Sequence, residues 1–143
     1  NITGEHYGAE ISLDWDIAPG LRIGGNYAYL ERSYDYIRPG TKPEGTPRHE
    51  AFLYLSWDAT PQLTITPSLN LASDRYSIVN SGIAPAYIET GAYALLNIQA
   101  EYKFNGNFSA AIGGTNLTDE NYELVEGFPE AGRQFFANAR MKF

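Results

Sequence analysis

The chain has 143 residues, of which 43% are hydrophobic and 14% aromatic, and its formal net charge is −7. This acidic balance argues against nucleic-acid binding, which needs basic patches. The absence of cysteine excludes disulfides, thiolate metal sites and cysteine nucleophiles. No run of 18 apolar residues is present, so the sequence predicts no transmembrane helix, although a membrane-spanning β-strand is only half apolar and escapes this test.

The first half of the chain alternates between apolar and polar residues with the period of two that is typical of β-strands. From Tyr7 to Ile17 every odd-numbered residue is apolar, and every even-numbered residue is polar or glycine. The same pattern predicts strands over residues 21–34, 48–59 and 63–76, with a loop at 38–47. Pro67 cannot donate to a ladder, so we expect a bulge or a broken ladder bond there.

The second half of the chain predicts a long loop at 77–91 and three more strands, at 92–104, 108–117 and 134–143. The last strand is the most informative, because its apolar residues alternate with polar ones as far as Phe143. We expect this strand to end on an exposed aromatic ring. Such a ring suits the interface of a membrane better than the surface of a soluble domain.

The predicted connections alternate between short turns of about three residues and long loops of roughly twelve to sixteen, which is typical of an outer-membrane β-barrel. The apolar faces carry no Asp, Glu, Lys or Arg. Lipid would enforce this sorting, because a charge at the bilayer midplane costs roughly 2–4 kcal/mol. Two aromatic belts are expected, with Trp15, Trp57, Tyr102, Phe104, Phe108 and Phe143 near the short turns and Tyr7, Tyr27, Tyr29 and Tyr93 toward the long loops.

Other patterns offer competing interpretations. Two Trp-Asp pairs, at 15–16 and 57–58, imitate a propeller repeat, but each interval holds two long strands rather than four short ones. A soluble sandwich or lipocalin-like barrel would show the same alternation, with the apolar face inside. His6 and His49 fit no metal-binding motif, and no nucleophile or nucleotide motif is present. We therefore expect neither an enzyme nor a cofactor.

Three elements near the C-terminus carry a resemblance to a known family. The box Asn116-Leu117-Thr118-Asp119-x-x-Tyr122 is followed by Gly127-Phe128-Pro129-x-x-Gly132-Arg133 and by the strand that closes on Phe143. In this order and spacing they resemble the C-terminus of TonB-dependent outer-membrane receptors. The resemblance implies an all-β fold, an antiparallel up-and-down meander of about seven long strands that forms the C-terminal part of a 22-stranded transmembrane β-barrel.

The resemblance also implies a function and partners. Residues 1–143 would be the C-terminal part of the receptor barrel, with the plug domain and earlier strands absent, in the bacterial cell outer membrane. The receptor would actively import a scarce bulky nutrient such as a ferric siderophore or cobalamin, energised by the TonB–ExbB–ExbD complex. Its other partners would be outer-membrane lipid and the assembly machinery, for which Phe135, Met141 and Phe143 would form the signal. A passive porin, an outer-membrane β-barrel enzyme and an adhesion barrel are the alternatives.

Loops usually carry binding residues, so candidate substrate contacts come from the predicted outer loops. They are Tyr34, Tyr36, Arg38, Tyr76, Tyr87 and Tyr122. Phe52, Tyr54 and Phe136 fall on the polar faces and are expected to point into the barrel lumen. An odd number of strands does not close a bacterial barrel, so we expect a curved, open sheet whose two edges pair with further strands.

Overall fold

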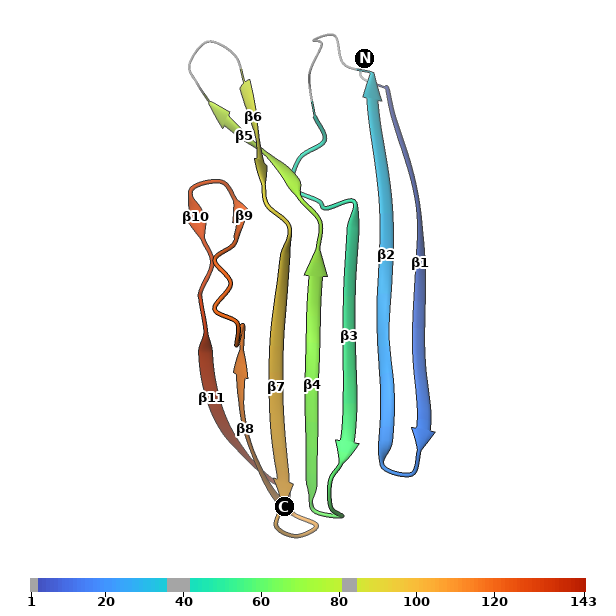
Figure 1. Ribbon diagram of the computed structural model, residues 1–143, viewed down its shortest axis with the longest axis vertical. Helices are drawn as coiled ribbons and strands as arrows, with labels where there is room; N and C mark the ends of the chain where they lie inside the picture. The colour runs from blue at the N-terminus through green and yellow to red at the C-terminus, as the bar shows by residue number, and fades with distance from the viewer. Residues whose placement is uncertain (1–2, 36–41, 81–84) are drawn as a thin grey trace.

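A computed structural model describes residues 3–35, 42–80 and 85–143, and over these residues the chain is all-β. Seven long strands form one antiparallel sheet in the order β1-β2-β3-β4-β7-β8-β11 (Figure 1). Their bounds are β1 Thr3–Ala18, β2 Leu21–Asp35, β3 His49–Asp58, β4 Leu63–Ala72, β7 Tyr93–Lys103, β8 Phe108–Thr115 and β11 Gln134–Met141. The predicted meander of seven strands is confirmed. In the described part of the chain no helix could cross a membrane.

The two long connections that follow β4 and β8 are not plain loops, and here the prediction was wrong. β4 ends at Ala72 rather than running to Tyr76, and β5 (Arg75–Asn80) pairs with β6 (Pro85–Thr90) in a separate hairpin. A smaller hairpin of β9 (Glu123–Val125) and β10 (Phe128–Pro129) follows β8. The alternation breaks at Ser73, whose hydroxyl accepts hydrogen bonds from the backbone N–H groups of Arg48 and His49.

Short turns and long connections lie at opposite ends of the sheet, as predicted. The β1–β2, β3–β4 and β7–β8 turns are at the bottom of Figure 1, and the hairpins and the N-terminus are at the top. Gly20 occupies the first turn with a φ of 73°, a conformation that costs glycine nothing. We call the two ends the turn end and the loop end.

The strand register gathers the apolar residues on one face. Leu13 pairs with Gly25, which lies opposite Leu53, and the same row continues through Leu69 to Leu96. The next row toward the turn end crosses from Ile98 through Gly114 to Phe135. The other face carries rows such as Ser12, Asn26, Phe52, Asn70 and Leu95. The alternation in the sequence therefore becomes a continuous apolar surface and a mainly polar one.

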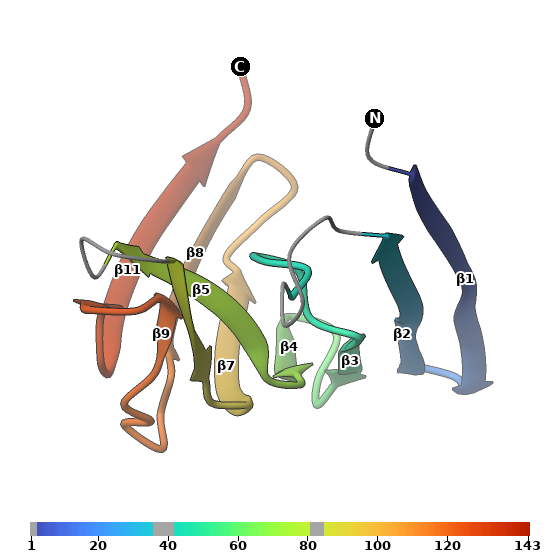
Figure 2. The same cartoon turned by 90° about the horizontal axis from the view of Figure 1, so that it is seen from above.

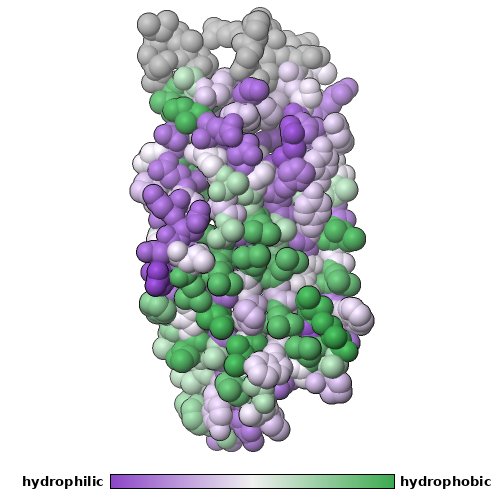
Figure 3. All heavy atoms as spheres, viewed as in Figure 1, coloured by the Kyte–Doolittle hydropathy of each residue, from purple (hydrophilic) through white to green (hydrophobic). Residues whose placement is uncertain are grey.

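The sheet is curved, and its apolar face is the convex one (Figures 2 and 3). Hydrophobic residues cover the middle and lower parts of this face, and hydrophilic ones gather toward the loop end (Figure 3). Ile11 is 66% exposed and Phe135 75% exposed, whereas along β7 the concave-face residues Leu95 and Asn97 are half-buried. Among the described residues only Ala72 and Ala111 are buried apolar side chains. This single layer without a core is neither a propeller nor a soluble sandwich.

The concave face is packed by aromatic rings that lie over glycines. A Cβ at Gly24 would come within 2.6 Å of the Tyr54 ring, and one at Gly113 would meet the ring of Phe136. Phe52 and Tyr54 stack on each other with ring centroids 6.0 Å apart. Phe52, Tyr54 and Phe136 thus lie on the concave face, as the alternation predicted. Tyr93, in contrast, pairs with Ala72 on the concave side, so its assignment to a lipid-facing belt was wrong.

Two local predictions concern the strand ladders. Pairing between β3 and β4 is interrupted opposite Pro67 and resumes in the same register at Trp57 and Ile65, so the broken-ladder form of the prediction is confirmed. The last strand was expected to reach Phe143, but β11 ends at Met141. Lys142 still donates its N–H to the Asn107 carbonyl at 2.8 Å, whereas Phe143 lies beyond the ladder and is fully exposed.

The sheet is open, as predicted. β1 and β11 are its two edges, and they do not pair with each other in the described part of the chain (Figure 2). An edge strand leaves a row of backbone N–H and C=O groups without partners, and each unpaired group costs several kcal/mol in lipid. A sheet with this apolar convex face therefore needs further strands at both edges.

Candidate functional site

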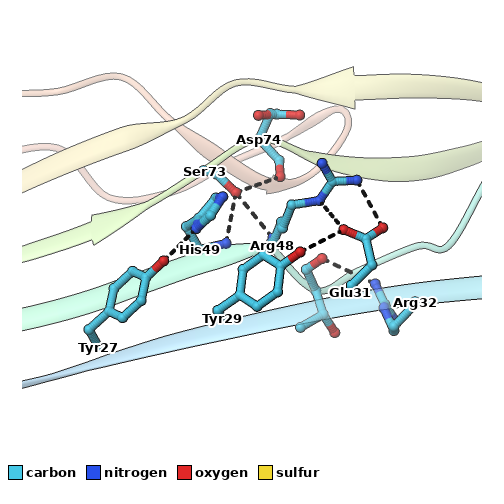
Figure 4. A network of polar contacts seen from close by, with 9 residues as sticks. Tyr27, Tyr29, Glu31, Arg32, Arg48, His49, Ser73 and Asp74 are labelled. Atoms are coloured by element: carbon cyan, nitrogen blue, oxygen red, sulfur yellow. Dashed lines mark hydrogen bonds and ion pairs between the residues drawn. The ribbon is translucent and has the colours of Figure 1, made fainter. Parts of the chain in front are cut away.

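A polar network marks the loop end of the convex face (Figure 4). The Tyr27 hydroxyl lies 2.7 Å from His49 Nδ1, and the Tyr29 hydroxyl donates to Glu31 at 3.1 Å. Glu31 in turn binds the Arg48 guanidinium through two contacts, at 2.9 and 3.0 Å. Tyr27 pairs with Ala51 in an apolar row, so the network borders the hydrophobic surface directly. It is the polar margin of that surface, at the level where a bilayer would meet water.

The same region anchors the connection between β2 and β3. The Arg32 guanidinium donates to the carbonyl oxygens of Glu44 and Thr46, both at 3.1 Å. Gly45, with a φ of 80°, donates its N–H to the Tyr76 carbonyl at 2.9 Å. The connection is thereby held against β5, although the two segments are far apart in the sequence.

A pocket of about 470 Å³ lies between this connection, the end of β2 and the start of β5. Its charged lining residues are Glu31, Arg32, Lys42, Arg48, Asp74 and Arg75. Tyr76 contributes an aromatic wall, and the Lys42 ammonium lies 5.3 Å from the centre of its ring. In a chain of net charge −7, this pocket collects an excess of cations, and it is the strongest candidate for a binding site.

Arg75 connects the pocket to the concave face. Its guanidinium lies over the Tyr93 ring at 5.4 Å, and the Tyr93 ring packs against Tyr122 with centroids 4.6 Å apart. Burial, together with the nearby Glu130 carboxylate, raises the pKa of Tyr122, so this phenol stays neutral at physiological pH. One cation and two aromatic rings from three separate segments are thus stacked at the loop end.

The structure places the predicted substrate contacts at different sites. Tyr76 lines the pocket, and Tyr122 belongs to the stack with Tyr93. Tyr87 lies opposite Ile78 in the β5–β6 hairpin, whereas Tyr34 meets His6 in an edge-to-face contact at the β1 side. Tyr36 and Arg38 lie outside the described residues. The structure brings Tyr76 and Tyr122 to the two sides of Arg75 and does not join Tyr34 or Tyr87 to them.

Sequence reasoning missed Arg75, Arg48 and Lys42. Arg75 fell inside a strand predicted to run to Tyr76, so its charge was not counted with the loops. Arg48 starts the charged run Arg48-His49-Glu50 at the head of a strand, and this density of charge beside a proline-rich loop was the available signal. Their convergence depends on contacts between distant segments.

Near the turn end the concave wall carries a second charged group. Arg22 binds Asp16 at 2.7 Å and lies 3.5 Å from Asp14, while the Tyr54 hydroxyl donates to Asp14 at 2.6 Å. These side chains are exposed, and each has a partner from a neighbouring strand. They form a solvated wall that contributes to the polar character of the lumen side.

The C-terminal box is a structural clamp. Asn116 is 4% exposed and has a φ of 49°; its side chain accepts from the Glu120 N–H at 2.8 Å and donates to the Glu120 carbonyl at 2.9 Å. Asp119, with a φ of 58°, accepts the Arg133 N–H at 2.8 Å. The Leu117 N–H donates to the Leu96 carbonyl. The box therefore turns the chain after β8 and fixes the point where β11 begins.

The proposed assembly residues lie on or beyond the last strand. Phe135 and Met141 are 75% and 63% exposed on the convex face, and Phe143 follows the end of β11. None of these observations tests recognition by an assembly machinery, which stays a prediction.

Comparison with known proteins adds independent evidence. The model of the family described as TonB dependent receptor-like, beta-barrel, matches residues 1–117. A comparison with curated proteins gave no match. Among solved structures, the ferripyoverdine receptor of the outer membrane of Pseudomonas aeruginosa aligns with a TM-score of 0.82 at 20% identity, over 99% of this chain and 20% of the receptor.

Two further receptors share the fold. The ferric-catecholate import receptor Fiu from E. coli K12 aligns with a TM-score of 0.79 at 23% identity, over 95% of this chain and 20% of that receptor. The siderophore receptor PiuA from Acinetobacter baumannii aligns with a TM-score of 0.77 at 19% identity, over 98% of this chain and 22% of that receptor. The chain therefore spans about a fifth of the length of the receptors that it matches.

Proposed function

Since this chain belongs to the TonB-dependent receptor β-barrel family of the bacterial outer membrane, we propose that it supplies one wall of a transporter that imports ferric siderophores. Residues 1–143 would be the last seven strands of a 22-stranded barrel, with β11 pairing to the first strand of that barrel and β1 to the strand before it. The two open edges of the sheet and the short span relative to the matched receptors support this arrangement.

The division between an apolar convex face and a polar concave face carries the proposal. Lipid would cover the surface around Ile11, Leu13 and Phe135, and a plug domain would face the wall that carries Asp14, Arg22 and Tyr54. The pocket at the loop end would lie toward the outside of the cell, where cargo arrives. Energy would come from the TonB–ExbB–ExbD complex acting on the plug.

A ferric siderophore is preferred to cobalamin as the cargo. The matched receptors are described as receptors for pyoverdine, for siderophores or for ferric catecholates. Identity near 20% carries the fold alone, so the substrate is an inference from family and site chemistry together. An aromatic and cationic loop end suits an iron chelate with charged and aromatic groups.

The test is growth of a deletion strain of the source bacterium. Under iron limitation we expect lost uptake of at least one ⁵⁵Fe-siderophore, with cobalamin uptake unchanged, and restoration by the intact gene but not by a gene whose TonB-contacting segment is deleted. Loss of cobalamin uptake would assign the other cargo. Uptake that is independent of TonB would favour a passive porin, and unchanged uptake of both solutes would leave an outer-membrane enzyme or an adhesion barrel.

A further inference from the structure

Arg75 is a cation whose surroundings do not neutralise it. The residue is 7% exposed, and its Nε and Nη2 atoms are buried without a hydrogen-bond partner among the described residues. In the described part of the chain no carboxylate lies within ion-pair distance of it, and the ring of Tyr93 is its closest charge-stabilising neighbour. A buried charge without a partner is costly, so this position calls for an anion.

The pocket beside Arg75 has the charge to receive one. Four cations line it, against the carboxylates of Glu31 and Asp74. Glu31 is already bound by Arg48, and Arg32 is occupied with carbonyl oxygens of the β2–β3 connection. Lys42 has only the face of Tyr76 as a neighbour among the described residues. Two cations, Arg75 and Lys42, therefore remain for a ligand, one on each side of Tyr76.

We propose that Arg75 and Lys42 form an anion-binding subsite that takes an oxyanion group, such as a carboxylate or a catecholate oxygen, of the imported solute. The subsite rests on the proposed transport function, because its ligand is part of the cargo. Arg75 presents a planar guanidinium suited to paired oxygens, and Lys42 adds a mobile point charge from the exposed connection. The tyrosine faces at Tyr76 and Tyr93 hold the two cations in place.

The subsite predicts discrimination by charge among solutes of the same size. An anionic iron chelate would place an oxygen against the buried guanidinium and remove the cost of its isolation. A neutral chelate would leave that charge without a partner.

The first experiment measures binding of inorganic phosphate to the purified full-length receptor in neutral detergent by equilibrium dialysis. We expect Arg75→Gln to weaken binding by at least about tenfold, which corresponds to the loss of a charge-assisted hydrogen bond. Arg75→Lys should retain part of the affinity, and Lys42→Gln, at an exposed position that tolerates change, should lose a smaller part. The matched control is Arg22→Gln, at the turn end, which should bind phosphate like the unmodified receptor. Absence of phosphate binding by the unmodified receptor, or equal binding by the Arg75→Gln and Lys42→Gln variants, overturns the subsite.

The second experiment measures cell uptake of two hexadentate ferric chelates of similar size, a trianionic tris-catecholate and a neutral tris-hydroxamate. We expect Arg75→Gln to reduce uptake of the trianionic chelate at least about tenfold and to leave any uptake of the neutral one unchanged. An equal loss for both chelates would mean a structural role and overturns the inference. If neither chelate enters cells with the unmodified receptor while phosphate binding still depends on Arg75, the transport proposal fails for these chelates and the anion subsite stands.

Discussion

The convex and concave faces of the seven-stranded sheet differ in both composition and exposure. On the convex face large apolar side chains such as Ile11 and Phe135 are more than half exposed, and on the concave face polar side chains and aromatic rings pack against one another. A water-soluble sheet shows the opposite arrangement, with its apolar face covered. The difference teaches that the solvent of the convex face is lipid, and each prediction below tests one consequence.

The largest effect is expected from a charge in the middle of the convex face. Leu13→Arg in the full-length receptor should lower the free energy of unfolding in a bilayer by about 2–4 kcal/mol, because the charge would enter hydrocarbon. Ser12→Arg, on the concave face one residue away, should change it by less than about 1 kcal/mol. Denaturant titration of the reconstituted receptor measures both. Equal losses at the two positions would contradict the assignment of the faces.

A smaller loss is expected at the clamp that follows β8. Asn116→Ala removes both side-chain bonds to Glu120 and places alanine at a φ of 49°, so stability should fall by about 2 kcal/mol. The exposed Asn121→Ala serves as the control and should cost less than about 0.5 kcal/mol. The heat-modifiable fraction on gels reports the folded receptor. A clamp variant as stable as its control would mean that the box has another role.

The packing of rings over glycines on the concave face predicts a loss of about 1–2 kcal/mol for Gly113→Ala. The added methyl group would meet the Phe136 ring and come within 2.6 Å of the Ile98 carbonyl oxygen. Gly91→Ala, where no atom lies within 4 Å, should be close to neutral. Unfolding midpoints of the two variants decide the matter, and a neutral Gly113→Ala would show that the ring moves away freely.

The polar margin of the convex face should contribute little to stability. Glu31→Gln breaks the pair with Arg48, but such partly exposed pairs contribute less than about 1 kcal/mol and are screened by salt. We expect the loss to shrink further when the unfolding titration is repeated at about 1 M salt. A larger loss that does not depend on salt would indicate that Glu31 is shielded from water in the complete receptor.

The smallest effect on stability is expected at the C-terminus. Deleting Phe143, which lies beyond β11 and is fully exposed, should change the unfolding free energy by less than about 0.5 kcal/mol. The amount of folded receptor in the outer membrane should nevertheless decrease if the terminal aromatic strand is the assembly signal. Immunoblots of membrane fractions and unfolding of the purified protein separate the two quantities. Normal assembly of the truncated receptor would remove Phe143 from the signal.

The candidate site divides in the same way into what was and was not predictable. Tyr76 and Tyr122 were predicted from their places in loops, and both lie beside Arg75, although nothing yet tests their binding of a substrate. Arg75 itself was hidden in a predicted strand, because Tyr76, Ile78 and Val79 continue a β-like pattern after Ser73. Only the hydrogen bonds of the Ser73 hydroxyl separate β4 from β5.

The sequence by itself determined the number of long strands, the residues on each face and the contrast between the two ends of the sheet. These properties depend on a period of two and on turn residues such as Gly20, which act within a few neighbouring positions. The tertiary structure decided that the β4–β7 connection is a hairpin, that Tyr93 faces the concave side and that Arg75 meets Lys42 across Tyr76. Such contacts join segments tens of residues apart, and a local pattern carries no information about which distant segments will meet.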